Sequence, residues 1–185
     1  MKLVLIILII IIAVVLAGWW LANQSGGTVT VKNSFNMSLS LTSPVLPAGG
    51  AVPSLYTCDG DNVSPPLKIE SVPTAAKSLA LVVDDPDAPN GSFIHWLVWN
   101  LKPTDQDLME GVTPSPAVAG TNSAGQVGYS GPCPPTGEHR YIFKLLALDT
   151  KLDLPVSTTI KEFNQATAGH ILEETTLTGR YRRSD

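Results

Sequence analysis

Two short stretches of the chain combine prolines with side chains that can do hydrogen-bonding or acid–base chemistry. The first is Asp85-Pro-Asp-Ala-Pro89, followed by His95, and the second is Gly131-Pro-Cys-Pro-Pro135, followed by His139 and Tyr141. Two imidazoles and a phenol supply hydrogen-bond donors for an anion, and a nearby carboxylate fixes an imidazole tautomer or holds it charged. The residue types therefore indicate recognition of an anionic group.

Strands must position these side chains, because apolar or alternating runs separated by Pro- and Gly-rich stretches predict a mainly β fold. The predicted strands are Met37–Leu41, Lys77–Asp84, Phe93–Leu101, Arg140–Asp149 and His170–Tyr181. One helix is predicted at Thr159–Ala168, where Thr159 and Glu162 fit a capping box and Gly169 can end the helix.

Strict alternation along a strand predicts which side chains share a face. Within the strand at Phe93–Leu101, one face is predicted to carry His95, Leu97 and Trp99, and the other Ile94, Trp96 and Val98. In the later strand His139 and Tyr141 share a face, and Arg140 opposes them and is predicted to pair with a carboxylate such as Asp87.

The histidines have an ordinary structural interpretation as well as a functional one. A single His95 in an apolar run is more often a hydrogen-bonded core residue than a ligand contact, and the proline stretch at 85–89 alone is more often a turn. Two of the three histidines nevertheless lie beside the densest proline stretches. If both strands begin at one rim of the sheet, His95, His139 and Tyr141 converge there with Asp85.

The length and the net charge of the chain limit the classes of protein to which it can belong. A chain of 185 residues with 44% apolar and 15% charged residues suits one globular domain with a substantial core. The net charge is −4, so we expect no broad basic surface of the kind that holds a nucleic-acid backbone. Nucleic acid is therefore excluded as an expected partner.

The N-terminus has the composition of a membrane segment. Residues 3–22 carry no charge, and a helix of that length spans about 30 Å, enough to cross the hydrocarbon core. It is either a signal peptide, cleaved after Val15-Leu-Ala17, or an uncleaved anchor with Trp19-Trp20 at the interface. We expect an anchor or signal peptide at 1–24, a linker at 25–34 and a domain at 35–185, which lies outside the cytoplasm, periplasmic or extracellular.

Export changes the interpretation of the two cysteines. Cys58 and Cys133 form an even pair in a compartment that permits disulfides, and neither belongs to a cluster of the kind that binds zinc. A Cys58–Cys133 disulfide is one hypothesis, and two separate thiols that act as small hydrophobic side chains are the alternative. We expect no metal and no cofactor.

Motifs along nearly the whole exported part resemble the phosphatidylethanolamine-binding proteins, which include the Raf kinase inhibitor proteins, and in particular their bacterial and archaeal branch. The resemblance runs from about Phe35 to Arg182. The motifs that carry it are Tyr56-Thr-Cys-Asp-Gly60, Asn62-Val-Ser-Pro-Pro66, Ser78 to Pro89, His95-Trp96, Gly128 to Pro135, His139-Arg-Tyr141, Gly169-His-Ile-Leu172 and Gly179-Arg-Tyr181.

This resemblance implies a β-sandwich with Greek-key topology, and with it we expect one or two short helices. It also implies a small surface cavity that accepts phosphate-like anions, including the head group of a phospholipid. The residues matched by motif to the ligand-binding site are Asp85, His95, His139 and Tyr141, with Gly131 and Pro132 on the rim.

The expected function is non-enzymatic binding of a small anionic or phosphorylated ligand by a membrane-tethered or exported protein. An alternative from another class is an inhibitor of proteases, or another protein-binding regulator, acting through exposed loops such as Thr104–Asn122. A third is a hydrolase built from Ser130 or Cys133 with His139 and Asp85. The chain contains no Gly-x-Ser-x-Gly motif, so we expect no enzyme.

Overall fold

A mainly β fold with two sheets is confirmed by the computed structural model, which describes Trp19 and residues 38–183. The chain divides into two units, Met1–Asn36 and Met37–Asp185, and the strands found in the described residues belong to the second. Within the described residues no helix is both long enough and apolar enough to cross a membrane. Apart from Trp19, the anchor predicted at residues 1–24 lies outside the described residues.

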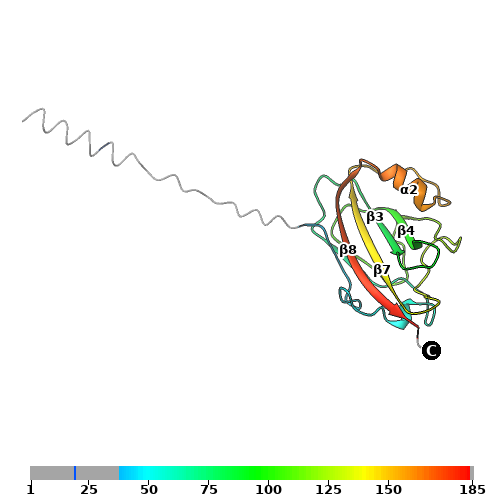
Figure 1. Ribbon diagram of the computed structural model, residues 1–185. Helices are drawn as coiled ribbons and strands as arrows, with labels where there is room; N and C mark the ends of the chain where they lie inside the picture. Colours follow the sequence, from blue (N-terminus) through cyan, green and yellow to red (C-terminus); the bar gives the residue numbers. More distant parts are fainter. Residues whose placement is uncertain (1–18, 20–37, 184–185) are drawn as a thin grey trace, which may run out of the picture. The chain divides into compact units, whose positions relative to one another are not determined.

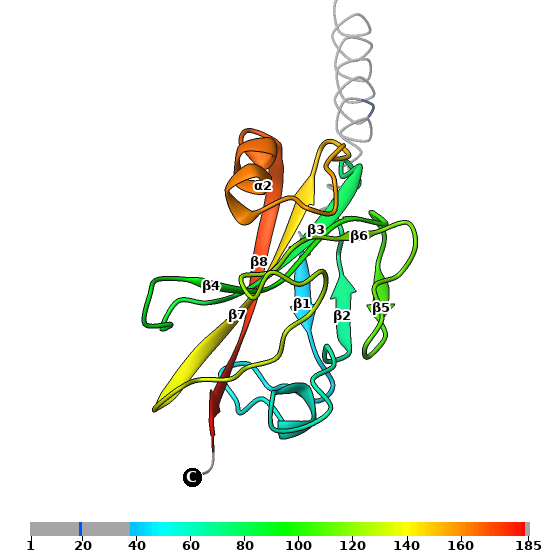
Figure 2. The same ribbon diagram turned by 90° about the vertical axis from the view of Figure 1, so that its right-hand side faces the viewer.

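The larger sheet has five strands in the order β6-β4-β3-β7-β8, and the smaller has three in the order β1-β2-β5 (Figures 1 and 2). The larger sheet consists of β3 Ser78–Asp85, β4 Phe93–Leu101, β6 Val118–Ala119, β7 Glu138–Leu148 and β8 Ile171–Arg182, and the smaller of β1 Ser40–Thr42, β2 Leu67–Glu70 and β5 Gln106–Leu108. All the strand pairs are antiparallel. The chain passes through β4, β5 and β6 before β7 returns to pair with β3.

A hydrophobic core fills the space between the two sheets. Alternate residues of β3 and β7, such as Leu81 and Phe143, pack there against Leu41 of β1 and Ile69 of β2. These side chains recur with the period of two that a strand imposes, so one face of each sheet is buried in a common core. Only β1 of the smaller sheet was predicted, because it overlaps the five-residue alternating run Met37–Leu41, whereas β2 and β5 have only four and three residues and belong to no such run.

The helix α2, Ile160–Thr167, covers the opposite face of the larger sheet. Its Phe163 is fully buried in a second core that contains Val82 of β3 and Trp99 of β4. The predicted capping box is present, since the Glu162 carboxylate accepts hydrogen bonds from the Thr159 N–H at 2.8 Å and from its hydroxyl at 2.9 Å. One further short helix, the 3-10 helix η1 at Ser54–Tyr56, precedes β2.

A β-bulge interrupts β4 at His95. The faces that strict alternation predicts for His95 and Ile94 are therefore wrong. Val83 pairs with Trp96 and the next residue of β3, Asp84, pairs with Ile94, which leaves His95 as an extra residue. The extra residue reverses the faces on its N-terminal side. Ile94 consequently packs in the core under α2, while the His95 ring lies 5.1 Å from the Tyr141 ring on the inner side.

We predict that Phe163→Ala lowers the free energy of unfolding by about 3–5 kcal/mol, because it leaves a cavity under α2. Urea denaturation of the full chain measures this loss. Gln165→Ala is the matched control, since Gln165 lies on the same helix and is exposed. Equal effects of the two substitutions would contradict the packing of α2 on the sheet.

Candidate ligand-binding site

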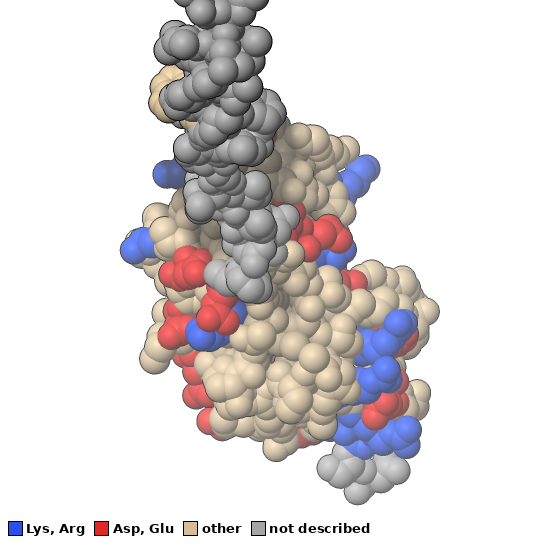
Figure 3. All heavy atoms as spheres, turned by 90° about the vertical axis from the view of Figure 1, so that its left-hand side faces the viewer, with Lys and Arg blue, Asp and Glu red and all other residues tan. Residues whose placement is uncertain are grey.

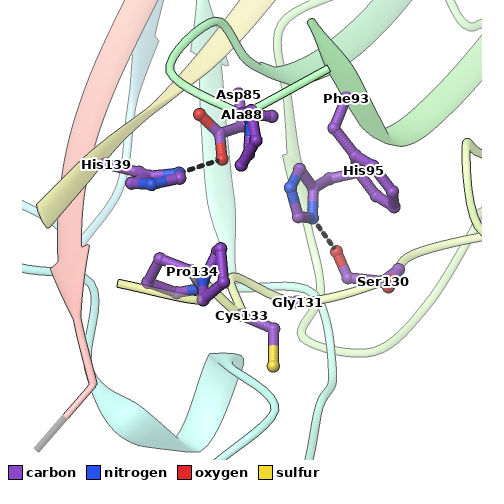
Figure 4. A pocket seen from close by; sticks show the side chains of 11 residues that line it. Asp85, Ala88, Phe93, His95, Ser130, Gly131, Cys133, Pro134 and His139 are labelled. Carbon is purple, nitrogen blue, oxygen red and sulfur yellow. Dashed lines mark hydrogen bonds and ion pairs between the residues drawn. The ribbon is translucent and has the colours of Figure 1, made fainter. Parts of the chain in front are cut away.

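A cavity of about 240 Å³ lies where β3 ends and where β4 and β7 begin. Its lining residues are Asp85, Ala88, Pro89, Phe93, His95, Ser130, Gly131, Cys133, Pro134, Pro135 and His139. Figure 4 shows His139 and His95 on opposite sides of this space, with Asp85 near His139. The volume is below the roughly 300–1,000 Å³ of cavities that enclose drug-sized ligands, so only a small group fits.

Asp85 and His139 form a buried pair on one side of the cavity. The Oδ2 atom of Asp85 lies 2.7 Å from Nδ1 of His139. The Oδ1 atom of Asp85 accepts a hydrogen bond from the Asp87 N–H at 2.8 Å. Because a carboxylate only accepts hydrogen bonds, Nδ1 of His139 carries the hydrogen. Among the described residues the second ring nitrogen, Nε2, makes no hydrogen bond.

His95, on the other side of the cavity, is held by a backbone carbonyl group and not by a charged side chain. Its Nδ1 donates to the Ser130 carbonyl oxygen at 2.6 Å, and a carbonyl can only accept, so the neutral ring is the Nδ1–H tautomer. Burial is the main reason why the pKa of His95 is lowered, although the carbonyl oxygens of Ser130 and Gly131 and the charges of Asp85 and Asp84 oppose the shift. In Figure 4 the other ring nitrogen faces the His139 side of the cavity.

The structure places Tyr141 and Pro132 behind the lining. Tyr141 is fully buried, with a hydroxyl that has no hydrogen-bond partner among the described residues. Burial and the charges of Asp85 and Asp87 raise the pKa of this phenol, so it stays a donor. Pro132 is buried, and its carbonyl accepts the Cys58 N–H at 3.1 Å. Of the six predicted ligand-binding residues, Asp85, His95, Gly131 and His139 line the cavity.

The segment at residues 129–133 is fixed against the turn at 56–62. The Tyr129 hydroxyl donates to the Tyr56 carbonyl at 2.8 Å, and the Gly131 N–H donates to Asn62 Oδ1 at 2.7 Å. A Cβ atom on Gly131 would lie 2.6 Å from the Tyr56 carbonyl oxygen and 2.8 Å from the Thr57 Cα, which is closer than real contacts. Only glycine therefore allows this approach of the two backbones.

A Cys58–Cys133 disulfide joins the same two segments, with Cα atoms 5.4 Å apart. The hypothesis of a disulfide agrees with the structure, and the alternative of two separate thiols does not. Because Cys133 lines the cavity, the disulfide holds one wall of it. Cys133 also has no free thiol, which removes it as a nucleophile.

The predicted pairing of Arg140 with Asp87 is present in the structure. The guanidinium reaches the carboxylate at 2.8 Å and 2.6 Å, and the Arg140 backbone N–H also donates to it at 2.9 Å. These hydrogen bonds hold the pKa of Asp87 well below its ordinary value. They tie the beginning of β7, next to His139, to the loop after Asp85.

Sequence reasoning missed Phe93 and Ala88 as lining residues, and Asn62 as a support. The Phe93 ring lies 4.8 Å from the His95 ring and gives the cavity an apolar wall. Asn62 adopts a positive φ of 58°, which asparagine tolerates better than most residues. An asparagine after Asp-Gly-Asp is a turn signal in the sequence, but nothing there shows that its side chain supports Gly131.

The whole arrangement suits reversible recognition of a small polar group. Two imidazoles with fixed tautomers, one carboxylate and the Ser130–Gly131 backbone surround a space whose other walls are apolar. Within residues 38–183 and at Trp19, no three His, Cys, Asp or Glu side chains gather in a way that could hold a metal ion.

The family model described as phosphatidylethanolamine-binding protein matches residues 42–182 of the chain. The UPF0098 protein of Methanothermobacter thermautotrophicus is 50% identical over 139 residues, which cover 72% of this chain and 92% of that protein. The UPF0098 protein of Chlamydia pneumoniae is 44% identical over 151 residues, covering 79% of this chain and 100% of that protein.

Two solved structures are also similar. A crystal structure of a phosphatidylethanolamine-binding protein homologue from Chlamydia trachomatis has a TM-score of 0.76 and 41% identity, and it covers 80% of this chain and 99% of that chain. YbcL of E. coli, described as a member of the mammalian family of these proteins, has a TM-score of 0.75 and 29% identity over 80% of this chain and 100% of that chain.

We predict that replacing both cysteines, Cys58→Ser with Cys133→Ser, lowers the free energy of unfolding by about 4 kcal/mol, because a disulfide across this length of chain restricts the unfolded state. Urea denaturation measures the loss. Added reductant should destabilise the wild type and leave the double variant unchanged, since both cysteines are exposed. A wild type that alkylates at two thiols without reductant would contradict the disulfide.

A second prediction concerns stability in mild acid. Because the pKa of His95 is lowered in the folded protein, the unfolded chain binds more protons below about pH 6.5, and stability falls as the pH drops through that value toward the folded pKa. A His95→Gln variant should lose less stability than the wild type between about pH 6.5 and 5. Chemical denaturation at several pH values measures both slopes. The same slope in both proteins would show that His95 is not the group responsible.

Proposed function

The chain belongs to the phosphatidylethanolamine-binding protein family, and we propose that it is a non-enzymatic binding protein whose cavity takes the phosphate-like anionic group of a small ligand. The observation that carries this proposal is the pair of imidazoles, His95 and His139, facing one small cavity with their tautomers fixed by Ser130 and Asp85. Their two Nε2 atoms are left for the ligand.

The dimensions of the cavity suggest that only the head group of a phospholipid would be bound inside it. A volume of about 240 Å³ accommodates a phosphate-like group with a short substituent. The walls at Ala88, Pro89, Phe93 and Pro134 are apolar and suit such a substituent. The acyl chains of a phospholipid would have to stay outside.

The buried Tyr141 hydroxyl provides a further donor. No hydrogen bond of normal geometry satisfies it among the described residues, although the Cys133 backbone N–H is close enough to oppose the rise of its pKa. The Tyr141 and His95 rings form a T-shaped pair with their centroids 5.1 Å apart. We assign Tyr141 the role of donating to the ligand, or to a water molecule held between the phenol and the ligand.

We further propose that the domain is tethered to a membrane and lies outside the cytoplasm. The uncharged stretch at residues 3–22 supports a tether, and the Cys58–Cys133 disulfide supports a compartment that permits disulfides. On the face shown in Figure 3 some lysine and arginine side chains lie next to acidic ones and others stand apart from one another. That mixture supports the exclusion of nucleic acid as a partner.

The protein-partner alternative stays a prediction. Within the loop region at 104–122, Met109 and Val112 expose 68% and 48% of their surface. Two exposed apolar side chains could contact a protein, but isolated exposed apolar residues are common on protein surfaces. The cavity has the more specific chemistry, and we prefer it.

We predict that the double variant His95→Ala/His139→Ala loses binding of inorganic phosphate and methyl phosphate, because the two Nε2 atoms that meet the anion are removed. Isothermal titration calorimetry on the full chain in a nonionic detergent measures binding. The wild type should bind more weakly as the pH rises through the histidine range, since fewer Nε2 atoms then carry a proton.

His170→Ala is the matched control for this test. His170 is the third histidine, is exposed, and pairs with Asp149 at 2.7 Å away from the cavity. It should retain wild-type affinity. Unchanged phosphate binding by the folded double variant would sink the proposed function, and circular dichroism would establish that the variant is folded.

A further inference from the structure

A second cavity, of about 360 Å³, lies between α2 and the face of the larger sheet that α2 covers, near the beginning of β8 (Figure 2). We propose that this cavity binds a free α-amino acid with an apolar side chain, whose carboxylate pairs with Lys144 and whose ammonium group pairs with Glu174. The cavity shares no lining residue with the one that contains His95 and His139. The proposal therefore stands independently of the proposed function.

The floor of this second cavity is apolar. It is formed by Val82 of β3, Ile94 of β4 and Leu146 of β7, with Phe163 of α2 beside them. All four side chains are buried in the core under α2, so close packing holds the floor in place without a ligand. The volume lies within the roughly 300–1,000 Å³ of typical small-molecule sites. An apolar side chain of a ligand therefore has room above this floor.

Two oppositely charged side chains stand at the rim of the second cavity. Lys144 of β7 lies opposite Thr176 of β8, and Glu174 is two residues from Thr176 along β8. Such diagonal neighbours on an antiparallel pair are roughly 7–8 Å apart. Within residues 38–183 neither of the two charged side chains forms an ion pair, with the other or with any other residue. A ligand that carries both charges can therefore pair with both.

The remaining charge at the rim narrows the class of ligand. Asp84 also lines the cavity, and its Oδ2 atom already accepts a hydrogen bond from the Ser92 hydroxyl at 3.1 Å. The lining thus has two acidic side chains and one basic one. A fatty acid would meet this excess of negative charge, and an alkyl amine would leave Lys144 without an anion. A zwitterion with an apolar side chain matches the floor and both unpaired charges.

The first test compares four probes by isothermal titration calorimetry: L-leucine, glycine, isocaproate and isoamylamine. The full chain is held in lipid nanodiscs, because detergent would compete for an apolar floor. Leucine should bind at least about tenfold more tightly than glycine, which lacks the apolar side chain. It should bind at least about fivefold more tightly than isocaproate, which lacks the ammonium group, and than isoamylamine, which lacks the carboxylate.

Charge variants at the rim locate the binding. Lys144→Gln and Glu174→Gln each remove one charge and nearly keep the shape of the side chain, so each should weaken leucine binding by at least about fivefold. Lys161→Gln is the matched control, since Lys161 lies on α2, is exposed and does not line the cavity. This control should bind leucine as the wild type does.

A blocking variant tests where the apolar side chain of the ligand lies. Asn164 is an exposed residue of α2 that lines the cavity, so the indole of Asn164→Trp would cover the floor without disturbing the core. This variant should abolish leucine binding. Gln165→Trp is its control, because Gln165 is exposed on the same helix and lies outside the lining.

The possible results separate this site from the histidine site. Leucine binding that falls in the two charge variants and in Asn164→Trp, and persists in both controls, supports the proposal. No binding of leucine by the wild type, equal affinity for leucine, isocaproate and isoamylamine, or full affinity in Asn164→Trp would each overturn it. Phosphate binding by the same samples reports on the histidine cavity alone, so a failure of one site is distinguishable from a failure of the other.

Discussion

The close approach of Gly131 to the backbone of Tyr56 and Thr57 is the contact on which the cavity depends. A side chain at residue 131 would collide with both neighbours, since a Cβ there would lie 2.6 Å and 2.8 Å from their atoms. The approach brings the Gly131 N–H to Asn62 and puts the next residues within reach of Cys58. It thereby fixes the Ser130 carbonyl that determines the tautomer of His95.

The β sandwich contributes a second constraint, which is the difference in regularity between β4 and β7. Pairing of β7 with β8 continues without a shift from Glu138 to Ala147, so His139 keeps the face that alternation assigns to it. Pairing of β4 with β3 shifts at His95. One extra residue is enough to turn His95 toward Tyr141 while Trp96 and Val98 remain in the core.

Much of the fold and part of the site follow from sequence patterns that are local. The long strands β3, β4, β7 and β8 have apolar or alternating runs, the α2 cap has Thr159 and Glu162 at the right spacing, and the Arg140 pairing follows from alternation. The face of His95 could not be predicted, because a bulge is set by pairing between strands and leaves no pattern in one strand. Asn62, whose side chain accepts the hydrogen bond from Gly131, lies 69 residues from it in the chain. No local sequence rule connects the two residues.

Every charged or imidazole side chain that lines the cavity from β3, β4 or β7 already has at least one hydrogen-bond partner. Asp85 is held by the Asp87 N–H and by His139, and Asp87 is itself held by Arg140, so surface charge and cavity are linked through consecutive hydrogen bonds. Proline at 86, 89, 132, 134 and 135 restricts the backbone that carries these groups. A ligand of the proposed kind would meet hydrogen-bonding groups that are oriented before it arrives, and it would lose affinity for each group that it left unpaired. We expect selectivity in such a cavity to depend on which nitrogen of each imidazole carries the hydrogen, because the prolines leave the walls little freedom to adjust.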